Sequence, residues 1–247
     1  MAVTDELDYI VYFENAPSAT APAQEVFVRD YLDPNLDWTT FRPTEVAFGD
    51  HVVPIQGSSG EFHTRLTIED YRQGVDKDWW LDITAEVNNT SGLAKWTFRT
   101  LDLETGELPE DPYAGFLPAN DPQTGCGEGH VTFRVRPNPG TPPGTVIRNS
   151  ATNVFDTEAP VPTNEVWNTV IDTSLPFMIE ETLRTANGRF RLRWNSWPGE
   201  SYTIWSCSDL TSGEWSEQAT VLSQGLSTLW TDSDTTSQRK FYRIELK

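Results

Sequence analysis

The chain has 247 residues, of which 37 are Asp or Glu and 18 are Lys or Arg, giving a formal net charge of −19. Residues 1–174 carry 28 acids against 10 bases, whereas residues 175–247 carry 9 against 8. Such an acidic surface repels nucleic acids and anionic membranes and attracts cations, so neither nucleic-acid binding nor membrane insertion is expected. Five of the ten tryptophans follow residue 174. The changes in charge and in tryptophan content at this point predict an acidic domain over 1–174 and a small Trp-rich domain over 175–247.

Apolar residues in the first domain recur at every second position, which predicts β-strands rather than helices. In chain order the alternation covers residues 9–13, 26–28, 62–68, 81–87, 93–98 and 131–135, and apolar runs follow at 146–155 and 166–171. Turn signals at 89–92 and 142–144 separate these strands. The best short helical candidate is 70–76. About nine or ten strands in a domain of this size predict an antiparallel sandwich, an elaborated immunoglobulin-like fold.

One long segment, residues 102–129, lacks any alternation, and loops of this length are usually functional or disordered. Its apolar residues Leu108, Tyr113, Phe116 and Leu117 predict that it packs on the sandwich. Residues 173–176 are expected to form a short linker.

The second domain alternates over 190–194 and 202–204, with further apolar positions at 215, 221–222, 229–230 and 241–244. This spacing predicts six or seven strands, roughly a small fibronectin-III-like sandwich. The whole chain is therefore expected to be all-β, with two tandem antiparallel β-sandwiches. One cysteine falls in each domain, Cys126 and Cys207, which excludes a disulfide within either domain. A bridge between the domains and two free thiols both remain open.

Two sets of motifs resemble known bacterial families. The first set comprises segments 12–15, 21–24, 33–37, 105–109, 115–118, 127–129 and 153–156. Through it, residues 8–172 resemble the "conserved repeat" immunoglobulin-like domains of large bacterial surface and secreted proteins. The second set comprises segments 190–196, 198–199, 208–210 and 239–243 together with Tyr202 and Trp215. Through it, residues 188–247 resemble a small fibronectin-III-like domain at the C-terminus of bacterial exported proteins.

Both resemblances imply a non-catalytic region of a large exported, extracellular or cell-surface protein, whose partners are neighbouring domains of the same parent chain. The sequence opens without a signal peptide, so we expect a piece of a longer exported chain rather than a cytosolic protein.

Three groups of oxygen-bearing residues are candidate calcium sites, because Ca²⁺ prefers carboxylate, carbonyl and water oxygens. The first is Asp102 with Glu104, in a segment that also fits a plain β-turn. The second is Asp156, Glu158 and Asn164, near the predicted domain boundary. The third comprises Glu14, Asn15, Asp30, Asp33 and Asp37. A bound Ca²⁺ would relieve self-repulsion in the acidic domain, and a plain solvated acidic surface is the alternative.

A candidate glycan site follows from a predicted hairpin over 189–207, in which Trp194 faces Tyr202 and Arg191 faces Trp205. This register places Arg189, Arg191, Arg193 and Trp205 on one outward face, with Trp197 at the adjoining turn. A ring that covers a sugar face and guanidinium groups that bind carboxylate or sulfate would suit an anionic polysaccharide. The alternative is that this face docks on the acidic first domain or on a neighbouring domain.

No catalytic motif is evident. His51, His63 and His130 lack zinc-binding spacing, and no helix is expected after the Gly-Ser-Ser-Gly segment at 57–60, as a nucleophile elbow requires. We therefore expect no enzyme activity. The sequence favours a structural or adhesive spacer or anchor, with Ca²⁺ as a stabilising ion. The alternative is a carbohydrate-binding module that targets a fused enzyme to a sulfated or uronic polysaccharide.

Overall fold

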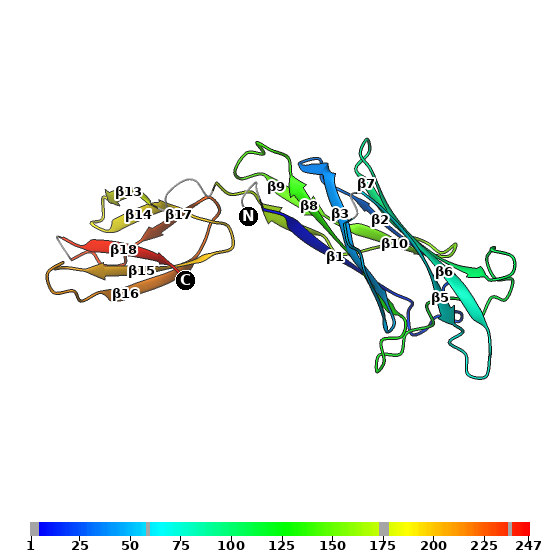
Figure 1. The fold of residues 1–247 in the computed structure, drawn as a ribbon. Coiled ribbons are helices and arrows are strands. Elements are labelled where there is room, and N and C mark those ends of the chain that lie inside the picture. Colours follow the sequence, from blue (N-terminus) through cyan, green and yellow to red (C-terminus); the bar gives the residue numbers. More distant parts are fainter. Residues whose placement is uncertain (1–4, 58–59, 173–177, 237–238) are drawn as a thin grey trace. The chain divides into compact units, whose positions relative to one another are not determined.

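The computed structural model describes residues 5–57, 60–172, 178–236 and 239–247, and these contain eighteen β-strands and no helix (Figure 1). Contacts divide the chain into two compact units. Among the described residues, the first comprises those up to Thr141 together with Ile147–Asn168, and the second comprises those from Thr169 to Lys247 together with Pro142–Val146. The all-β fold with antiparallel sandwiches is confirmed. Residues 70–76 form turns and bends, so the helical candidate there is wrong.

The first unit packs a four-stranded sheet on a six-stranded sheet. The smaller sheet has the order β1-β8-β3-β4, with β1 (Leu7–Glu14), β8 (Glu128–Pro137), β3 (Leu36–Phe48) and β4 (His51–Pro54). The larger sheet has the order β11-β10-β2-β7-β6-β5, with β11 (Val161–Pro162), β10 (Ala151–Phe155), β2 (Glu25–Tyr31), β7 (Leu93–Asp102), β6 (Asp78–Asn88) and β5 (Glu61–Glu69). Strands β9 (Val146–Asn149) and β12 (Val166–Thr169) form a separate two-stranded sheet.

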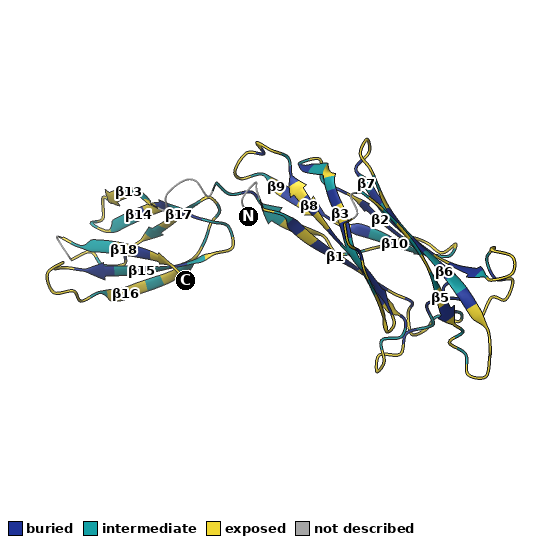
Figure 2. Cartoon of the chain, viewed as in Figure 1, coloured by how far each residue is buried: buried dark blue, intermediate teal, exposed yellow. Residues whose placement is uncertain are grey.

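Aromatic rings fill the space between these sheets. Trp96 of β7 contacts Phe41 of β3 and Phe133 of β8, with ring centroids 5.6 and 5.3 Å apart. Phe98, two residues further along β7, contacts Phe13 of β1 at 5.4 Å. All five side chains are buried. Strands β3, β8 and β1 therefore lie over β7, and burial alternates along β1 as its sequence predicts (Figure 2).

Strand β3 is the longest in the described residues, yet its sequence does not alternate. The pairing register with β8 shifts between Asp37 and Arg42 and again between Pro43 and Glu45. Each such bulge adds residues on one side of the ladder and changes which side chains face inward. The burial pattern of β3 is irregular for this reason, and sequence alternation missed the strand.

The long segment after β7 packs on the end of the sandwich, as expected from Phe116 and Leu117. Both are buried, and the Phe116 ring stacks on Phe98 with centroids 5.5 Å apart and planes inclined by 9°. The main chain of Leu117 pairs with Ala23 in an isolated bridge. Tyr113 is instead 55% exposed, so the prediction that it anchors the loop is wrong.

The second unit has two three-stranded sheets. Their orders are β13-β14-β17 and β16-β15-β18, with β13 (Ile179–Arg184), β14 (Phe190–Asn195), β17 (Ser227–Thr231), β16 (Ser216–Leu222), β15 (Ser201–Cys207) and β18 (Phe241–Leu246). Trp194 of β14 packs edge-on against Tyr202 of β15 in the core, with centroids 5.8 Å apart. Cys126 and Cys207 are both free thiols. The predicted linker at 173–176 lies outside the described residues.

Candidate functional site: a groove along strand β1

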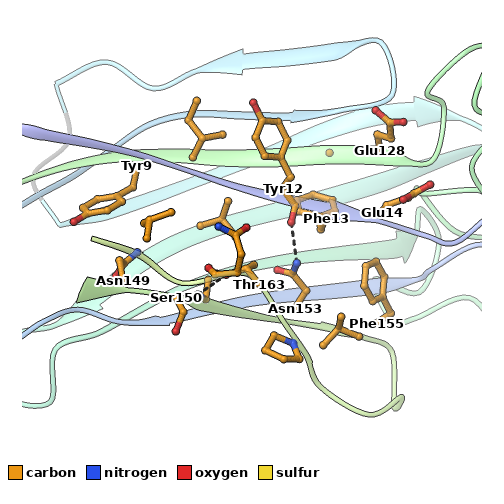
Figure 3. Close-up of a pocket in the computed structure, with 18 of the residues that line it drawn as sticks. Tyr9, Tyr12, Phe13, Glu14, Glu128, Asn149, Ser150, Asn153, Phe155 and Thr163 are labelled. Atoms are coloured by element: carbon orange, nitrogen blue, oxygen red, sulfur yellow. Dashed lines mark hydrogen bonds between the residues drawn. The ribbon is translucent and has the colours of Figure 1, made fainter. Parts of the chain in front are cut away.

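A groove of about 870 Å³ runs along one side of the first sandwich (Figure 3). Residues 9–14 of β1 form one wall, and residues of β10, β11 and the chain up to Val166 form the other. The smaller sheet ends at β1, whereas the larger sheet continues through β10 to β11. At the other side of the sandwich, β3 contacts β5 and β6, so the two sheets close on each other there. The groove therefore follows from the unequal number of strands in the two sheets.

The free edge of β1 faces this groove. The side-chain amide of Asn153 donates a hydrogen bond from Nδ2 to the main-chain oxygen of Tyr12 at 2.9 Å (Figure 3). In an antiparallel ladder the N–H and C=O of one residue point to the same side, and that side alternates along the strand. The main-chain groups of Ile10 and Tyr12 thus point to the groove, and those of Val11 point to β8.

Two buried asparagines line the opposite wall with unsatisfied acceptors. Asn149 and Asn153 are 6% and 5% exposed, and neither side-chain oxygen has a hydrogen-bond partner among the described residues. Asn149 donates from Nδ2 to Asp30 at 2.7 Å. A buried acceptor without a donor costs free energy, roughly 1–3 kcal/mol. The groove therefore holds polar groups that a bound donor would satisfy.

Asp30 lies beneath this wall and is fully buried. Burial raises the pKa of Asp30 to about 7, and the hydrogen bond from Asn149 acts in the opposite direction. One of its carboxyl oxygens has no partner in the described part of the chain.

The end of the groove beside β8 is acidic. Glu14 and Glu128 line it and stand directly opposite each other in the β1–β8 ladder. Both accept from the same Nδ2 of Asn120, at 2.7 and 3.0 Å. Like charges in opposite positions repel, and a neutral amide only bridges them. This end therefore favours a cation.

The first calcium candidate lies in a turn, which the main-chain N–H of Gly106 closes by donating to the main-chain oxygen of Asp102 at 2.8 Å. One carboxylate oxygen of Asp102 accepts from Lys77 Nζ at 2.8 Å, and the other accepts the main-chain N–H groups of Glu104 and Thr105 at 2.8 and 3.3 Å. The bond from Lys77, followed by that from Glu104, lowers the pKa of Asp102. Glu104 is exposed. Both oxygens of Asp102 are thus engaged by the protein itself.

In the second calcium candidate, the side chain of Asp156 holds two main-chain N–H groups at the start of β2. Asp156 has φ of 47°, and its Oδ1 accepts the N–H groups of Gln24 and Glu25 at 2.9 and 2.8 Å. Burial raises its pKa. Glu158 and Asn164 are exposed. Among all described residues, no group of three or more His, Cys, Asp or Glu is placed to hold a metal ion.

The third calcium candidate is likewise tied to the protein itself. Asn15 donates to the main-chain oxygens of Ala21 and Leu117, Asp33 accepts from Asn35, and Asp37 accepts from Thr39. Glu14 lies at the end of the groove beside Glu128, and Asp30 lies beneath the groove wall.

The predicted hairpin over 189–207 is wrong. Strand β14 pairs with β13 and β17, and β15 pairs with β16 and β18, so the two strands belong to opposite sheets. Arg191 and Arg193 share Glu181 of β13, at 3.1 and 3.2 Å. Trp205 lies in the other sheet. The contact between Trp194 and Tyr202 is real, but it crosses the sandwich core. Alternation identifies the inward residues of a strand and does not say which sheet the strand joins.

A different arginine accompanies Trp205. Arg243 of β18 is the ladder partner of Trp205, and its guanidinium lies 5.5 Å from that ring and 5.0 Å from the ring of Trp215. Both tryptophans are half-buried, and so is Trp197, whose main-chain N–H donates to the Tyr202 hydroxyl at 2.8 Å. Arg189 is exposed before β14. The Arg243 contact was missed because it depends on the pairing of β15 with the last strand.

A family model described as a domain of unknown function (DUF7619) matches residues 1–65 and 114–169. All residues that line the groove lie within these two matched segments. No curated protein and no solved structure matches the chain. The described residues include no helix that is long and apolar enough to cross a membrane.

Proposed function

We propose that the chain is a non-catalytic, structural and adhesive region of a larger exported bacterial protein, in which the first sandwich presents a binding surface. The observation that carries this proposal is the position of the two ends of the first sandwich. Asn168 of β12 lies close enough to the Tyr9 hydroxyl, near the start of β1, to influence the pKa of that hydroxyl. The chain thus enters and leaves this sandwich at the same end, and the loops beyond Glu14 project from the other end. A domain whose chain enters and leaves at one end projects its opposite end outward. It does not lengthen the parent protein as a domain in a linear stalk would.

The use of the acids supports a structural role. Asp70, with a nearly inaccessible side chain, accepts from Arg72 at 2.6 Å and from the indole N–H of Trp79 at 3.1 Å. The hydrogen bonds from Arg72 hold the pKa of Asp70 at about 2. Asp156 similarly holds the start of β2. Shifted acids of this kind are expected at active sites, but here they fix main chain and loops.

Force spectroscopy on the full chain tests the presenting role. Handles at Asp5 and Trp167 would pull both ends of the first sandwich from one side and peel β1 from β8 one bond at a time. Handles at Asp5 and Asp121 would pull along the strands and load several bonds together. We expect the sandwich to unfold at a clearly lower force with the first pair. Equal resistance in both geometries would instead favour a load-bearing spacer and contradict the proposal.

A second candidate function is binding of an anionic polysaccharide by the second sandwich. The observation that favours it is the Arg243 guanidinium between the rings of Trp205 and Trp215. Affinity electrophoresis in gels containing heparin or alginate tests it. We expect retardation of the native chain and its loss in Arg243→Gln, with Arg239→Gln as the control because Arg239 lies 5.5 Å from a different ring, Phe241. Absence of retardation in every gel would refute this function.

A further inference from the structure

We propose that the groove along β1 binds an extended segment of another polypeptide, which adds as a fifth strand to the smaller sheet and places a Lys or Arg beside Glu14 and Glu128. This inference rests on the proposed binding role of the first sandwich and names its partner class.

The shape of the groove favours an extended chain. Six consecutive residues of β1 form one wall, a length of roughly 20 Å at about 3.3 Å per residue. The other wall is also built from strand residues, those of β10 and β11. The lining of the groove includes apolar side chains such as Val11 and Phe155 and the polar side chains of Asn149 and Asn153. A strand inserted here would extend the order β1-β8-β3-β4 by one position and lie across from β10 and β11.

The edge of β1 has the features of an open pairing site. Edge strands are normally blocked by Pro, Lys, bulges or a covering segment. Strand β1 contains neither Pro nor Lys, pairs with β8 without a register shift, and exposes Ile10 by 54% and Tyr12 by 66%. The hydrogen bond from Asn153 to the main-chain oxygen of Tyr12 takes the place of one that a neighbouring strand would donate. Peptides that add to such an edge gain main-chain hydrogen bonds, and pockets for alternate side chains give specificity.

The free acceptors of the far wall point to the same ligand. The oxygens of Asn149 and Asn153 have no partner in the described residues and almost no exposed surface, so a shift of these side chains would let them accept N–H groups, which an extended peptide supplies at regular intervals. At the acidic end, the Glu14–Glu128 pair lacks an ion-pair partner in the described residues, unlike Asp8, which pairs with Arg134. A basic side chain at that position would be attracted by both carboxylates.

A second copy of the chain is a poor occupant. Antiparallel pairing of two β1 strands centred on Val11 would put Asp8 opposite Glu14 twice. Like charges in opposite positions are destabilising, and two chains with a net charge of −19 also repel at long range. The partner is therefore a different polypeptide segment, apolar at alternate positions and basic at the end.

Fluorescence anisotropy with the full chain tests the charge selection. The probe is a fluorescein-labelled peptide of sequence KVTVTVTK, whose two lysines make it independent of strand direction. We expect it to bind, and a peptide with Glu in place of both lysines to bind much more weakly. The double variant Glu14→Gln/Glu128→Gln should weaken binding by about fivefold, the upper end for exposed ion pairs. The matched control is Glu61→Gln/Glu86→Gln, which changes another pair of facing glutamates outside the groove and should leave affinity unchanged.

Amide hydrogen exchange measured by NMR tests the position of the added strand. Peptide binding should slow exchange at Ile10 and Tyr12, whose N–H groups face the groove, and leave Val11 and Phe13 unchanged. Ile10→Pro removes one groove-facing N–H without breaking the ladder to β8, so it should reduce affinity in a folded chain. Failure to bind millimolar peptide, protection elsewhere, or dimerisation of the chain in sedimentation would each overturn the inference. The force experiment is done without peptide and measures no binding, so the presenting role can stand or fall separately.

Discussion

Replacing Asp30 by asparagine should remove a pH-dependent loss of stability from the first sandwich. Asp30 is fully buried, and burial raises its pKa to about 7 from its ordinary value of 3.8. Because the folded-state pKa is the higher one, Asp30 imposes no penalty below pH 3.8, where it is protonated in both states. Stability then falls as the pH rises from 3.8 to 7, because the unfolded chain releases the proton in this range while the folded chain keeps it, and the loss is complete once the pH has passed 7.

The size of the effect follows from the shift. A pKa shift of one unit corresponds to about 1.4 kcal/mol, so ionised Asp30 lowers the free energy of unfolding by on the order of 4 kcal/mol at pH 8.5. Asparagine retains an oxygen that can accept from Asn149 and carries no charge. Its amide N–H groups would occupy a site where one Asp30 oxygen has no partner, so they would be buried without an acceptor. This cost reduces the gain in stability. We therefore expect Asp30→Asn to stabilise the first sandwich by about 2–4 kcal/mol at pH 8.5 and by little or nothing at pH 4.5.

Urea unfolding of the full chain, followed by the NMR signals of Trp96 and Phe98, measures this sandwich separately from the second one. Asp76→Asn is the control, because Asp76 is exposed in the connection between β5 and β6. A native first sandwich that becomes more stable between pH 5 and 8 would refute the reasoning, as would an Asp30→Asn variant no more stable than the native chain at pH 8.5.

Three further predictions concern other acids. Asp156→Ala should lower the free energy of unfolding by about 2 kcal/mol, since two main-chain N–H groups lose their acceptor, and Asp156→Gly should lose less because glycine adopts φ of 47° freely; chemical denaturation of both variants measures this. Asp232 is buried, and although burial opposes the change, its bonds to Lys240, Asp234 and Tyr242 lower its pKa. The stability that Asp232 contributes is therefore present above pH 3.8 and lost in acid. The melting temperature of the second sandwich should fall as the pH falls, and Asp232→Asn should make it depend less on pH. Asp102→Asn should change the melting temperature only slightly and equally in EDTA and in millimolar Ca²⁺; a loss seen only with Ca²⁺ would show that Asp102 binds the ion.

Local structure could be predicted from the sequence wherever one face of a strand is buried in regular alternation. Tyr9, Val11 and Phe13 could be assigned to the inner face of β1 because side chains alternate across a strand. The same reasoning placed Phe116 and Leu117 of the long loop against the core, because a compact domain must cover such residues. It failed for β3, where bulges interrupt the alternation.

The pairing of strands could not be predicted in this way, because it depends on the packing of the whole domain. Arg191 and Trp205 were expected on one face, yet β14 and β15 join different sheets, and Arg243 from the last strand takes the place beside Trp205. The groove along β1 has the same origin, since it exists because the smaller sheet stops where the larger one continues. Alternation records the burial of each strand separately, whereas sheet order is set by how all the strands pack together, and the candidate site depends on that order.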